Sequence, residues 1–494
     1  MIGLRNFSLI DLGDCMRLKP GKTLWLAALL FCTGLLATAQ QSELSGWVMQ
    51  YVSIPRGTIA LVHAKVIDGT GTPVKDDQTI LILGSVIAQI GPSSSVSVPA
   101  RARVLDLTGK SVFPGIVGMH EHLYFTSYVD DHAPTLNELP FSFPRLYLAA
   151  GVTTIRTAGA LDAYADLALK DQIDEGNEPG PTIFVTSPLL DGTSYSLGPH
   201  LKDAADATRT VRYWNGEGIN WFKIYNHISR AEAKAVIEEA HAHGAKVTGH
   251  LCSLGYTEAI NLGIDNIEHG FLLDSEFNPR KTSDRCPSGS PLAGFASLDL
   301  NAQPLQDLIR LLVQHHVALT STLPVFADYE ADAPPVDPRV LQVLAPESRA
   351  SCLVQRKQSA DPKNTMGTIL EKEMKAEKAF VDSGGLLLAG LDPTGNGCVI
   401  AGYGDQREIE LLVKAGFRPE EAIKIATHNG AEFLGVANSV GTIEMGKQAD
   451  LVVAAGDPTQ RIEDIEKVEV VFKAGAGFDP VKLMQSVQGF VGLR

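Results

Sequence analysis

Hydrophobic positions near the two ends of the chain follow a β-strand pattern. Short apolar stretches separated by glycine turns occupy residues 58–71 and 79–91 near the start, and 439–457 and 468–475 near the end. Such runs are typical of strands joined by tight turns, and Gly84-Ser85 lies where a hairpin would reverse direction. We therefore expect β-structure at both ends of the chain.

The middle of the chain has a different pattern, in which short apolar runs alternate with amphipathic segments. The clearest amphipathic segments are 230–244, which ends at a glycine, and 304–316, and both are typical of helices. Repeated strand and helix signals predict a closed parallel barrel of the TIM type, with a doubly wound open sheet as the alternative. The eight expected strands are 113–120, 152–158, 182–187, 219–225, 246–250, 264–269, 317–322 and 386–392.

These patterns predict an α/β protein with a (β/α)8 TIM barrel and a small β-sandwich formed from both chain ends. We expect the sandwich to comprise residues 58–112 and 439–490, and the barrel residues 113–438. The polar, proline-rich stretches within 274–380 exceed what one strand and helix need. We expect them to form loops at the barrel mouth that shape a substrate pocket.

The first 39 residues have the order of a secretory signal peptide. Three basic residues within 17–22 precede the apolar run 24–39, which ends in Ala37-Thr38-Ala39. Because the run is shorter than the roughly 20 apolar residues of a membrane span, we expect cleavage and export to the periplasm or medium. An uncleaved N-terminal anchor is the alternative. After cleavage we expect no membrane association.

Cysteine usage and charge narrow the expected context further. Four cysteines remain beyond the signal, and export permits disulfides in any of three full pairings. Since Cys286 and Cys352 lie in the same polar insertion, we expect these two to pair. The formal net charge of −15 argues against a nucleic-acid partner, which needs a basic surface. A small molecule or peptide is the expected partner, and homo-oligomer formation stays open.

The strongest candidate chemistry begins with His120 and His122 at the end of the first expected barrel strand. Side chains on a strand alternate with period two, so both rings point to the same face. Active sites of TIM barrels lie where the strands end. Neutral imidazoles are common metal ligands, so the pair predicts a metal centre.

Four further polar residues lie at or near the ends of other expected strands. They are Lys223, His250, His269 and Asp392. A lysine within an apolar strand needs a partner, because lysine is seldom buried alone. We therefore expect all six side chains to converge at the barrel mouth, the alternative being interior polar residues held by hydrogen bonds.

Substrate contacts are expected from residues next to this set. Tyr225 follows Lys223 on the same strand face, where it could donate a hydrogen bond to an oxyanion or simply pack. Tyr195, His200 and His227 fall in loops after the third and fourth strands and are candidates for substrate binding.

Together these motifs resemble the amidohydrolase superfamily. The resemblance covers nearly the whole chain after the signal, including FPGIVGMHEH at 113–122 and the run from ATHNGAEFLG at 426–435 to GTIEMGKQADLVV at 441–453. It is nearest to the subgroup of imidazolonepropionase-like proteins, Xaa-Pro dipeptidases and ochratoxin-type amidases. One departure is Met119, where many members carry a polar or acidic residue.

The resemblance implies a site with two divalent metal ions. His120 and His122 would bind the more buried ion, and His250 and His269 the more exposed one. Lys223, carbamylated by carbon dioxide, would bridge both. Zinc is the expected metal, because it suits nitrogen and oxygen ligands.

The resemblance also implies a reaction. Asp392 would bind the buried ion and carry a proton from the bridging hydroxide to the leaving nitrogen, in hydrolysis of a C–N amide bond of a dipeptide or N-acyl amino acid. One alternative is a deaminase or cyclic-imide hydrolase with one metal, although Lys223 argues against it. The other is an exported binding protein without catalysis.

Overall fold

The computed structural model describes residues 43–127, 135–192, 198 and 200–492, all within the unit Ser42–Arg494. The expected signal peptide, residues 1–39, and the candidate Tyr195 lie outside the described residues. Among the helices of the described part, none combines the length and apolarity that a membrane span requires.

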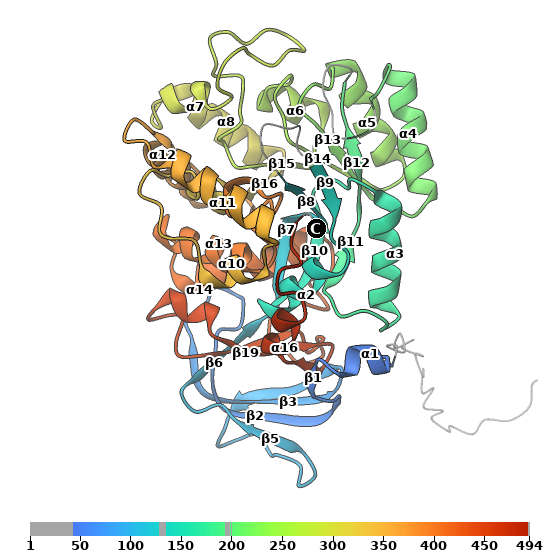
Figure 1. Ribbon diagram of the computed structural model, residues 1–494, viewed down its shortest axis with the longest axis vertical. Coiled ribbons are helices and arrows are strands. Elements are labelled where there is room, and N and C mark those ends of the chain that lie inside the picture. The colour runs from blue at the N-terminus through green and yellow to red at the C-terminus, as the bar shows by residue number, and fades with distance from the viewer. Residues whose placement is uncertain (1–42, 128–134, 193–197, 199, 493–494) are drawn as a thin grey trace, which may run out of the picture. The chain divides into compact units, whose positions relative to one another are not determined.

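Parallel strands form the centre of the fold, and their order follows the chain (Figure 1). One sheet has the order β11-β10-β7 and the other β12-β13-β14-β15-β16-β17, with every neighbouring pair parallel. The strands are β7 (Ile116–Glu121), β10 (Val152–Thr157), β11 (Thr182–Phe184), β12 (Thr186–Leu190), β13 (Trp221–Ile224), β14 (Lys246–Gly249), β15 (Asn266–Glu268), β16 (Ala318–Ser321) and β17 (Leu387–Ala389).

Backbone hydrogen bonds link the two parallel sheets in two places. On one side the backbone N–H of Ala160, after β10, donates to the carbonyl of Ser187 in β12 at 3.0 Å. On the other side the N–H of Asp392, just after β17, donates to the carbonyl of His120 in β7 at 3.0 Å. The arrangement is a TIM-barrel-like α/β fold, which agrees with the class expected from the sequence.

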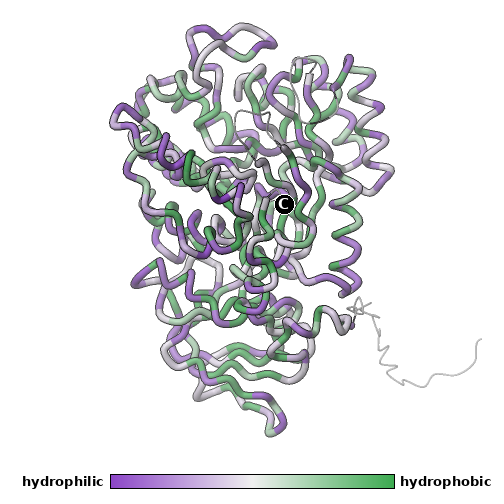
Figure 2. Tube along the Cα trace, in the orientation of Figure 1, coloured by the Kyte–Doolittle hydropathy of each residue, from purple (hydrophilic) through white to green (hydrophobic). Residues whose placement is uncertain are grey.

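Helices between the strands cover this centre with their apolar faces. Figure 2 shows hydrophilic and hydrophobic residues interspersed along the outer helices. In α8 the buried side chains Leu305, Leu308 and Leu312 recur at helical spacing. The helices are α1 (Gly46–Met49), α2 (Ser142–Ala149), α3 (Ala163–Asp174), α4 (Ala204–Gly216), α5 (Arg230–Ala242), α6 (Tyr256–Leu262), α7 (Ala293–Ser297), α8 (Gln303–Gln314), α9 (Leu323–Ala327), α10 (Pro338–Val343), α11 (Pro346–Ser359), α12 (Met366–Asp382), α13 (Tyr403–Lys414), α14 (Pro419–Lys424), α15 (Gly430–Phe433) and α16 (Pro480–Gln485), with short turns η1 (Asn396–Cys398), η2 (Ile425–Asn429) and η3 (Ile462–Glu466).

Both ends of the described chain contribute strands to one nine-stranded sheet, seen at the bottom of Figure 1. Its order is β1-β20-β19-β18-β6-β2-β3-β4, with β5 pairing β2. Strand β18 therefore joins the late strands to β6, which leads directly into β7. The remaining bounds are β1 (Val52–Ile54), β2 (Gly57–Val66), β3 (Lys75–Gly84), β4 (Val86–Pro92), β5 (Arg103–Asp106), β6 (Lys110–Pro114), β18 (Leu451–Ala455), β19 (Val468–Lys473) and β20 (Ala476–Phe478); a separate hairpin is formed by β8 (Tyr124–Ser127) and β9 (Thr135–Glu138).

One expectation about local structure differs from the fold. The expected strand 182–187 is split into β11 and β12, which pair with different neighbours. The polar, proline-rich stretches 274–291 and 329–337 form loops, as expected, and helices α7 to α12 occupy other parts of the chain from residue 293 to residue 382.

The expected disulfide between Cys286 and Cys352 is wrong. Cys286 pairs with Cys252, and Cys352 pairs with Cys398. The insertion folds back over the loop after β14, which carries Cys252, whereas Cys352 lies in α11, beside η1. Nearness along the chain therefore did not mean nearness in space.

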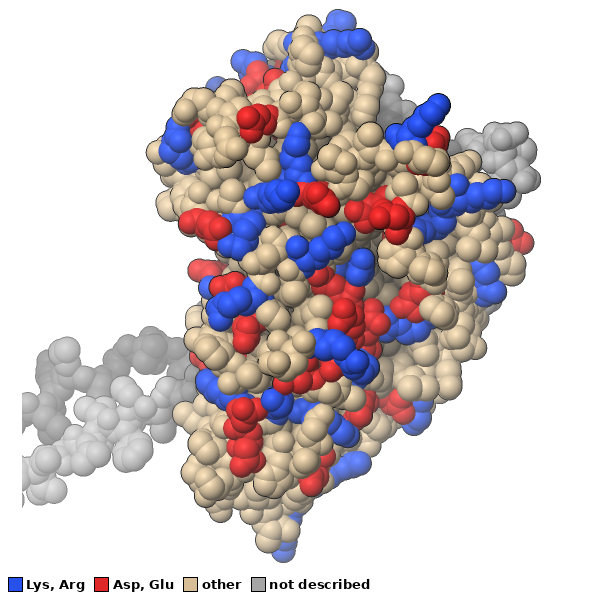
Figure 3. Space-filling model, turned by 90° about the vertical axis from the view of Figure 1, so that its left-hand side faces the viewer, with Lys and Arg blue, Asp and Glu red and all other residues tan. Residues whose placement is uncertain are grey.

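Charged side chains are mixed on the face of the molecule that Figure 3 shows. Lys and Arg are interspersed there with Asp and Glu. Positive and negative charges therefore offset one another on this face. The net charge of the chain is negative because the sequence contains more acidic than basic residues.

Candidate metal centre

Strand β7 places two buried imidazole rings at the end of the parallel sheet. His120 Nδ1–H donates to Glu268 Oε2 at 2.8 Å, and His122 Nδ1–H donates to the carbonyl of Gly159 at 3.0 Å. Each ring therefore has its Nε2 atom turned toward Asp392, whose Oδ1 lies 3.7 Å from His120 Nε2 and 3.3 Å from His122 Nε2. Anchoring one ring nitrogen in this way fixes the tautomer and leaves the other nitrogen as an electron-pair donor.

Asp392 reaches these rings because the chain makes a close and strained approach after β17. A Cβ atom at Gly390 would lie 2.4 Å from the Cβ of His120, so only glycine fits between the two segments. Asp392 itself has φ of 59°, in the left-handed region, and His269 has φ of 67°. Such backbone conformations in non-glycine residues are held by the surrounding structure and are concentrated at functional sites.

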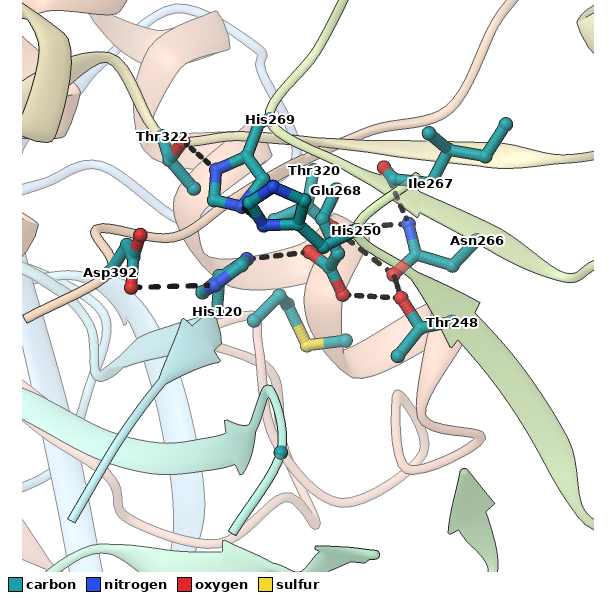
Figure 4. A network of polar contacts seen from close by, with 12 residues as sticks. His120, Thr248, His250, Asn266, Ile267, Glu268, His269, Thr320, Thr322 and Asp392 are labelled. Atoms are coloured by element: carbon teal, nitrogen blue, oxygen red, sulfur yellow. Dashed lines mark hydrogen bonds and ion pairs between the residues drawn. The ribbon is translucent and has the colours of Figure 1, made fainter. Parts of the chain in front are cut away.

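His250 and His269 form the second part of the cluster. The Nδ1 atom of His250 lies 3.0 Å from Nε2 of His269, and the other nitrogen of His269 contacts Thr322 Oγ1 at 2.8 Å. Figure 4 shows the two rings beside His120, which in turn lies between Asp392 and Glu268. Three of these side chains, His120, His269 and Asp392, have ligand atoms within 4.8 Å of one another.

Lys223 projects from β13 into the same space and is fully buried. Its Nζ atom has no hydrogen-bond partner among the described residues, and its nearest carboxylate oxygen, Glu268 Oε1, is 3.8 Å away. Burial lowers the pKa of the Lys223 amine to about 8, against the attraction of Glu268. The amine is therefore neutral more often than an exposed lysine.

A buried polar network that the sequence reasoning missed supports the histidines from behind. The carboxylate of Glu268 accepts a hydrogen bond from Arg156 at 2.6 Å and another from Thr248, in addition to that from His120. Burial alone would raise the pKa of Glu268, but the charges of Arg156 and Lys223 and the hydrogen bond from His120 hold it well below its ordinary value. The signal in the sequence was an arginine inside the apolar run 152–158 and a glutamate directly before His269.

The donor atoms fit a divalent cation. Ligands about 2.1 Å from a tetrahedral ion lie roughly 3.3 Å apart, and the gaps of 3.0, 3.3 and 3.7 Å measured here bracket that spacing. Burial lowers the pKa of His120 to about 4 and that of His250 and His269 well below the ordinary value, so these rings are neutral. Neutral imidazoles, a carboxylate and an orphaned amine suit a transition metal such as zinc.

A cavity of about 230 Å³ opens directly above these side chains. Tyr225 and Tyr124 stand on its walls, with ring centroids 4.8 Å from His250 and 4.7 Å from His122 respectively. The six residues expected to bind metal all line it, so the structure brings the predicted set together. They are His120, His122, Lys223, His250, His269 and Asp392.

The other predicted substrate residues have different surroundings. His227 lines an adjoining cavity, and its Nδ1 atom lies 3.5 Å from the buried carboxylate of Asp191. His200 Nδ1–H donates to the carbonyl of Gly192 at 3.0 Å, and the ring lines neither of these two cavities. Tyr195 lies outside the described residues.

Comparison with known proteins connects this site to a family. The family model described as the amidohydrolase family matches residues 111–476. Among curated proteins, an imidazolonepropionase of Streptomyces avermitilis is 26% identical over 259 residues, or 45% of this chain and 60% of the relative. A second, from Streptomyces griseus, is 33% identical over 24% of this chain and 30% of its own length. The chain thus matches less than two thirds of the length of these relatives.

Solved structures share the fold over most of the chain. A Xaa-Pro dipeptidase with methionine bound in its active site has a TM-score of 0.64 at 22% identity, over 86% of this chain and 100% of that one. Ochratoxinase of A. niger has a TM-score of 0.62 at 16% identity, over 88% and 99%. These structures show the shared fold, and the match of the amidohydrolase family model to residues 111–476 confirms the family resemblance drawn from the sequence motifs.

Proposed function

The chain belongs to the amidohydrolase family, and from this premise we propose that it hydrolyses a C–N amide bond with two bound divalent ions. The observation that carries the proposal is the buried amine of Lys223, which lies among four histidines and one carboxylate without a hydrogen-bond partner in the described residues. A carbamate on this nitrogen would supply the anionic oxygen atoms that two cations need.

We assign the ligands in two groups, as the family resemblance implies. His120, His122 and Asp392 would hold the more buried ion, and His250 and His269 the more exposed one, with carbamylated Lys223 between them. Zinc is the proposed metal. Divalent ions bound there would lower the pKa of a water molecule and polarise the scissile carbonyl.

Asp392 and Tyr225 are the residues that would act on the substrate. Burial would raise the pKa of Asp392, but the hydrogen bond with His122 holds it well below its ordinary value. Its carboxylate is therefore ionised at neutral pH, and in the proposed reaction it would accept a proton and return it to the leaving nitrogen. Tyr225 lines the cavity beside His250, where its hydroxyl would donate to the oxyanion of the tetrahedral intermediate.

Metal analysis combined with a Lys223 variant tests this proposal. We expect close to two ions per wild-type chain and hydrolysis of at least one member of a dipeptide and N-acyl amino acid library. In Lys223→Ala we expect fewer than two ions and loss of most of the activity, with partial rescue by a short carboxylic acid. Full activity in Lys223→Ala, or no metal uptake by the wild type, would contradict the two-ion site.

The setting of the enzyme completes the proposal. We propose that it is exported and loses residues 1–39, since the two disulfides favour an oxidising compartment. We also propose that the parallel strands close into a full (β/α)8 barrel and that the two-ended sheet forms a β-sandwich. Detection of a mature N-terminus after residue 39 in the extracellular or periplasmic fraction tests the export.

A further inference from the structure

A second cavity adjoins the metal centre beside the segments that follow β14, β15 and β16. It measures about 390 Å³ and shares four lining residues with the first cavity, namely His250, His269, Asp392 and Asn396. We call it the apolar chamber. Because both cavities open onto the same ligands, a molecule whose reacting bond lies at the metal centre extends into both of them.

The walls of the apolar chamber are built from hydrophobic side chains. Leu251, Leu273 and Val325 are buried in the wall, and the ring of Phe326 lies 6.0 Å from that of His269. The first cavity is lined instead by hydroxyl and amide groups around the metal ligands, including Tyr124, Thr126, Tyr225, Thr394 and Asn396. The two sides of the centre therefore suit different chemical groups.

One disulfide holds the outer wall of the apolar chamber. Cys252 lies two residues after His250, and Cys286 lies in the insertion that precedes α7. Both cysteines line the chamber together with Pro287 and Pro291. The bond therefore ties the insertion to the segment that carries a candidate metal ligand, and the insertion cannot swing away from the centre.

The chamber offers no cationic partner for a charged substrate group. Among the described residues that line either cavity, Lys223 is the single lysine or arginine, and it is buried at the metal centre. The segments 128–134 and 193–199 contain no lysine or arginine in their sequence. Among the described lining residues, His227 is the remaining basic side chain outside the ligand set, and a positive charge on it would be offset by Asp191 at 3.5 Å. Away from the metal ligands, a free carboxylate placed in the chamber would meet no cation among these residues to replace its lost hydration.

We propose that the apolar chamber binds an uncharged, bulky apolar group of an amide substrate, next to the scissile bond, and that the Cys252–Cys286 disulfide fixes its wall. This rests on the proposed hydrolysis of C–N bonds and narrows it. The substrate class is an amide with a long aliphatic or aromatic substituent, in preference to one with an acidic substituent.

A matched series of substrates tests the preference. Acetyl-, 3-phenylpropanoyl- and 3-carboxypropanoyl-glycinamide vary the acyl side, and the corresponding acetamides of methylamine, 2-phenylethylamine and β-alanine vary the amine side. We expect kcat/KM of the zinc-loaded enzyme to rise at least tenfold from the small to the phenyl member on one side, and to be lower for the acidic member. Equal values across both series would overturn the proposal.

Two variants of the chamber locate the effect. Leu273→Trp should fill the chamber and remove the preference for the phenyl member, whereas Pro287→Arg adds a cation at its rim and should raise the relative rate of the acidic member at least tenfold. Pro335→Arg, in a separate cavity beside α10, is the matched control and should change neither ratio. The same shift in Pro335→Arg as in Pro287→Arg would contradict the assignment.

The disulfide has its own comparison. Cys252→Ser/Cys286→Ser should raise KM for the phenyl substrate at least fivefold with little change for the small one. Cys352→Ser/Cys398→Ser, which removes the other disulfide, should leave that selectivity unchanged. Equal loss of selectivity in both double variants would overturn the role of the Cys252–Cys286 bond.

Direct binding separates this proposal from the proposed function. Titration calorimetry with 3-phenylpropanamide should show binding to the zinc-loaded protein that weakens at least tenfold in Leu273→Trp. If no amide is hydrolysed but the probe binds more weakly to Leu273→Trp than to the wild type, the chamber assignment is supported and the proposed reaction is wrong. If amides are hydrolysed but the probe binds wild type and variant equally, the chamber assignment fails.

Discussion

Glu268→Gln removes one charge from the buried network behind the metal centre and should destabilise the metal-free protein. The substitution keeps the shape of the side chain but leaves Arg156, which is fully buried, without its anionic partner at 2.6 Å. Breaking a buried ion pair by removing one partner typically destabilises a fold by about 3–5 kcal/mol. Because the glutamine oxygen still accepts one hydrogen bond, we expect about 3 kcal/mol in urea unfolding of the metal-free protein.

Glu377→Gln is the matched control for this charge effect. Glu377 is equally buried, but it has no buried cation as partner, and burial together with the charge of Glu373 raises its pKa well above the ordinary value. It is therefore already neutral at pH 7, and its amide is a close substitute that accepts from Ser321 in the same way. We expect a loss below about 1 kcal/mol.

The comparison of the two glutamate variants decides whether the network is held by charge. Glu268→Gln should also weaken zinc binding by about 10–100-fold in a chelator competition, since outer partners of ligating histidines have effects of that size. Losses of stability within 1 kcal/mol of each other, with unchanged zinc affinity, would refute the reasoning. A second substitution, Thr248→Val, removes an uncharged donor from the same carboxylate and should have a smaller effect.

The remaining predictions concern catalysis, pH, strain and the second disulfide. Tyr225→Phe should lower kcat by about 10²–10³ with little change in KM, and a change in KM alone would show a binding role. Burial raises the pKa of Glu373 from 4.5 to about 8, so between these pH values the folded state keeps a proton that the unfolded state loses. The free energy of unfolding should therefore fall as the pH rises from 4.5 to 8. Glu373→Gln should make this pH dependence smaller in urea unfolding. Gly390→Ala would place its Cβ 2.4 Å from that of His120 and should reduce bound zinc measured by elemental analysis, whereas a normal zinc content would show that the segment can shift. Cys352→Ser/Cys398→Ser removes a disulfide that closes a loop of 46 residues and should lower the free energy of unfolding by up to about 4 kcal/mol. An unchanged unfolding midpoint would show that this disulfide does not stabilise the fold.

The parallel strands could be predicted because most of them are short apolar runs, several of which are followed directly by a polar residue. His250 directly follows β14, and His269 directly follows β15, as their sequence positions suggested. Helix α5 likewise has strong local signals, with Ser229 and Glu232 forming a capping box at its start. Strands and helices can thus be predicted from the sequence alone when the residues that determine them lie within a segment of about ten or fifteen residues.

The support of the site was less readable because it depends on pairs far apart in the sequence. Arg156 and Glu268 are 112 positions apart, and each one alone looks like an isolated charge in an apolar segment. Arg156 lies in β10 and Glu268 in β15, which belong to different parallel sheets, and only the packing of both sheets around the same centre makes one residue the partner of the other. Two charges of opposite sign within buried strands could have been treated as one feature, since an unpaired buried charge is unfavourable.

Specificity is harder to predict from the sequence than the metal centre, and the disulfides show why. The metal ligands come from strand ends, whose positions the hydrogen-bonded sheet determines. The wall of the apolar chamber comes from an insertion without a regular apolar pattern, and its position depends on the covalent link from Cys286 to Cys252. The wrong pairing of Cys286 with Cys352 would have placed this insertion beside α11 and away from His250. The position of the Cys252–Cys286 disulfide therefore changes the inferred substrate pocket but not the inferred metal centre. Substrate specificity and metal binding consequently need separate experiments.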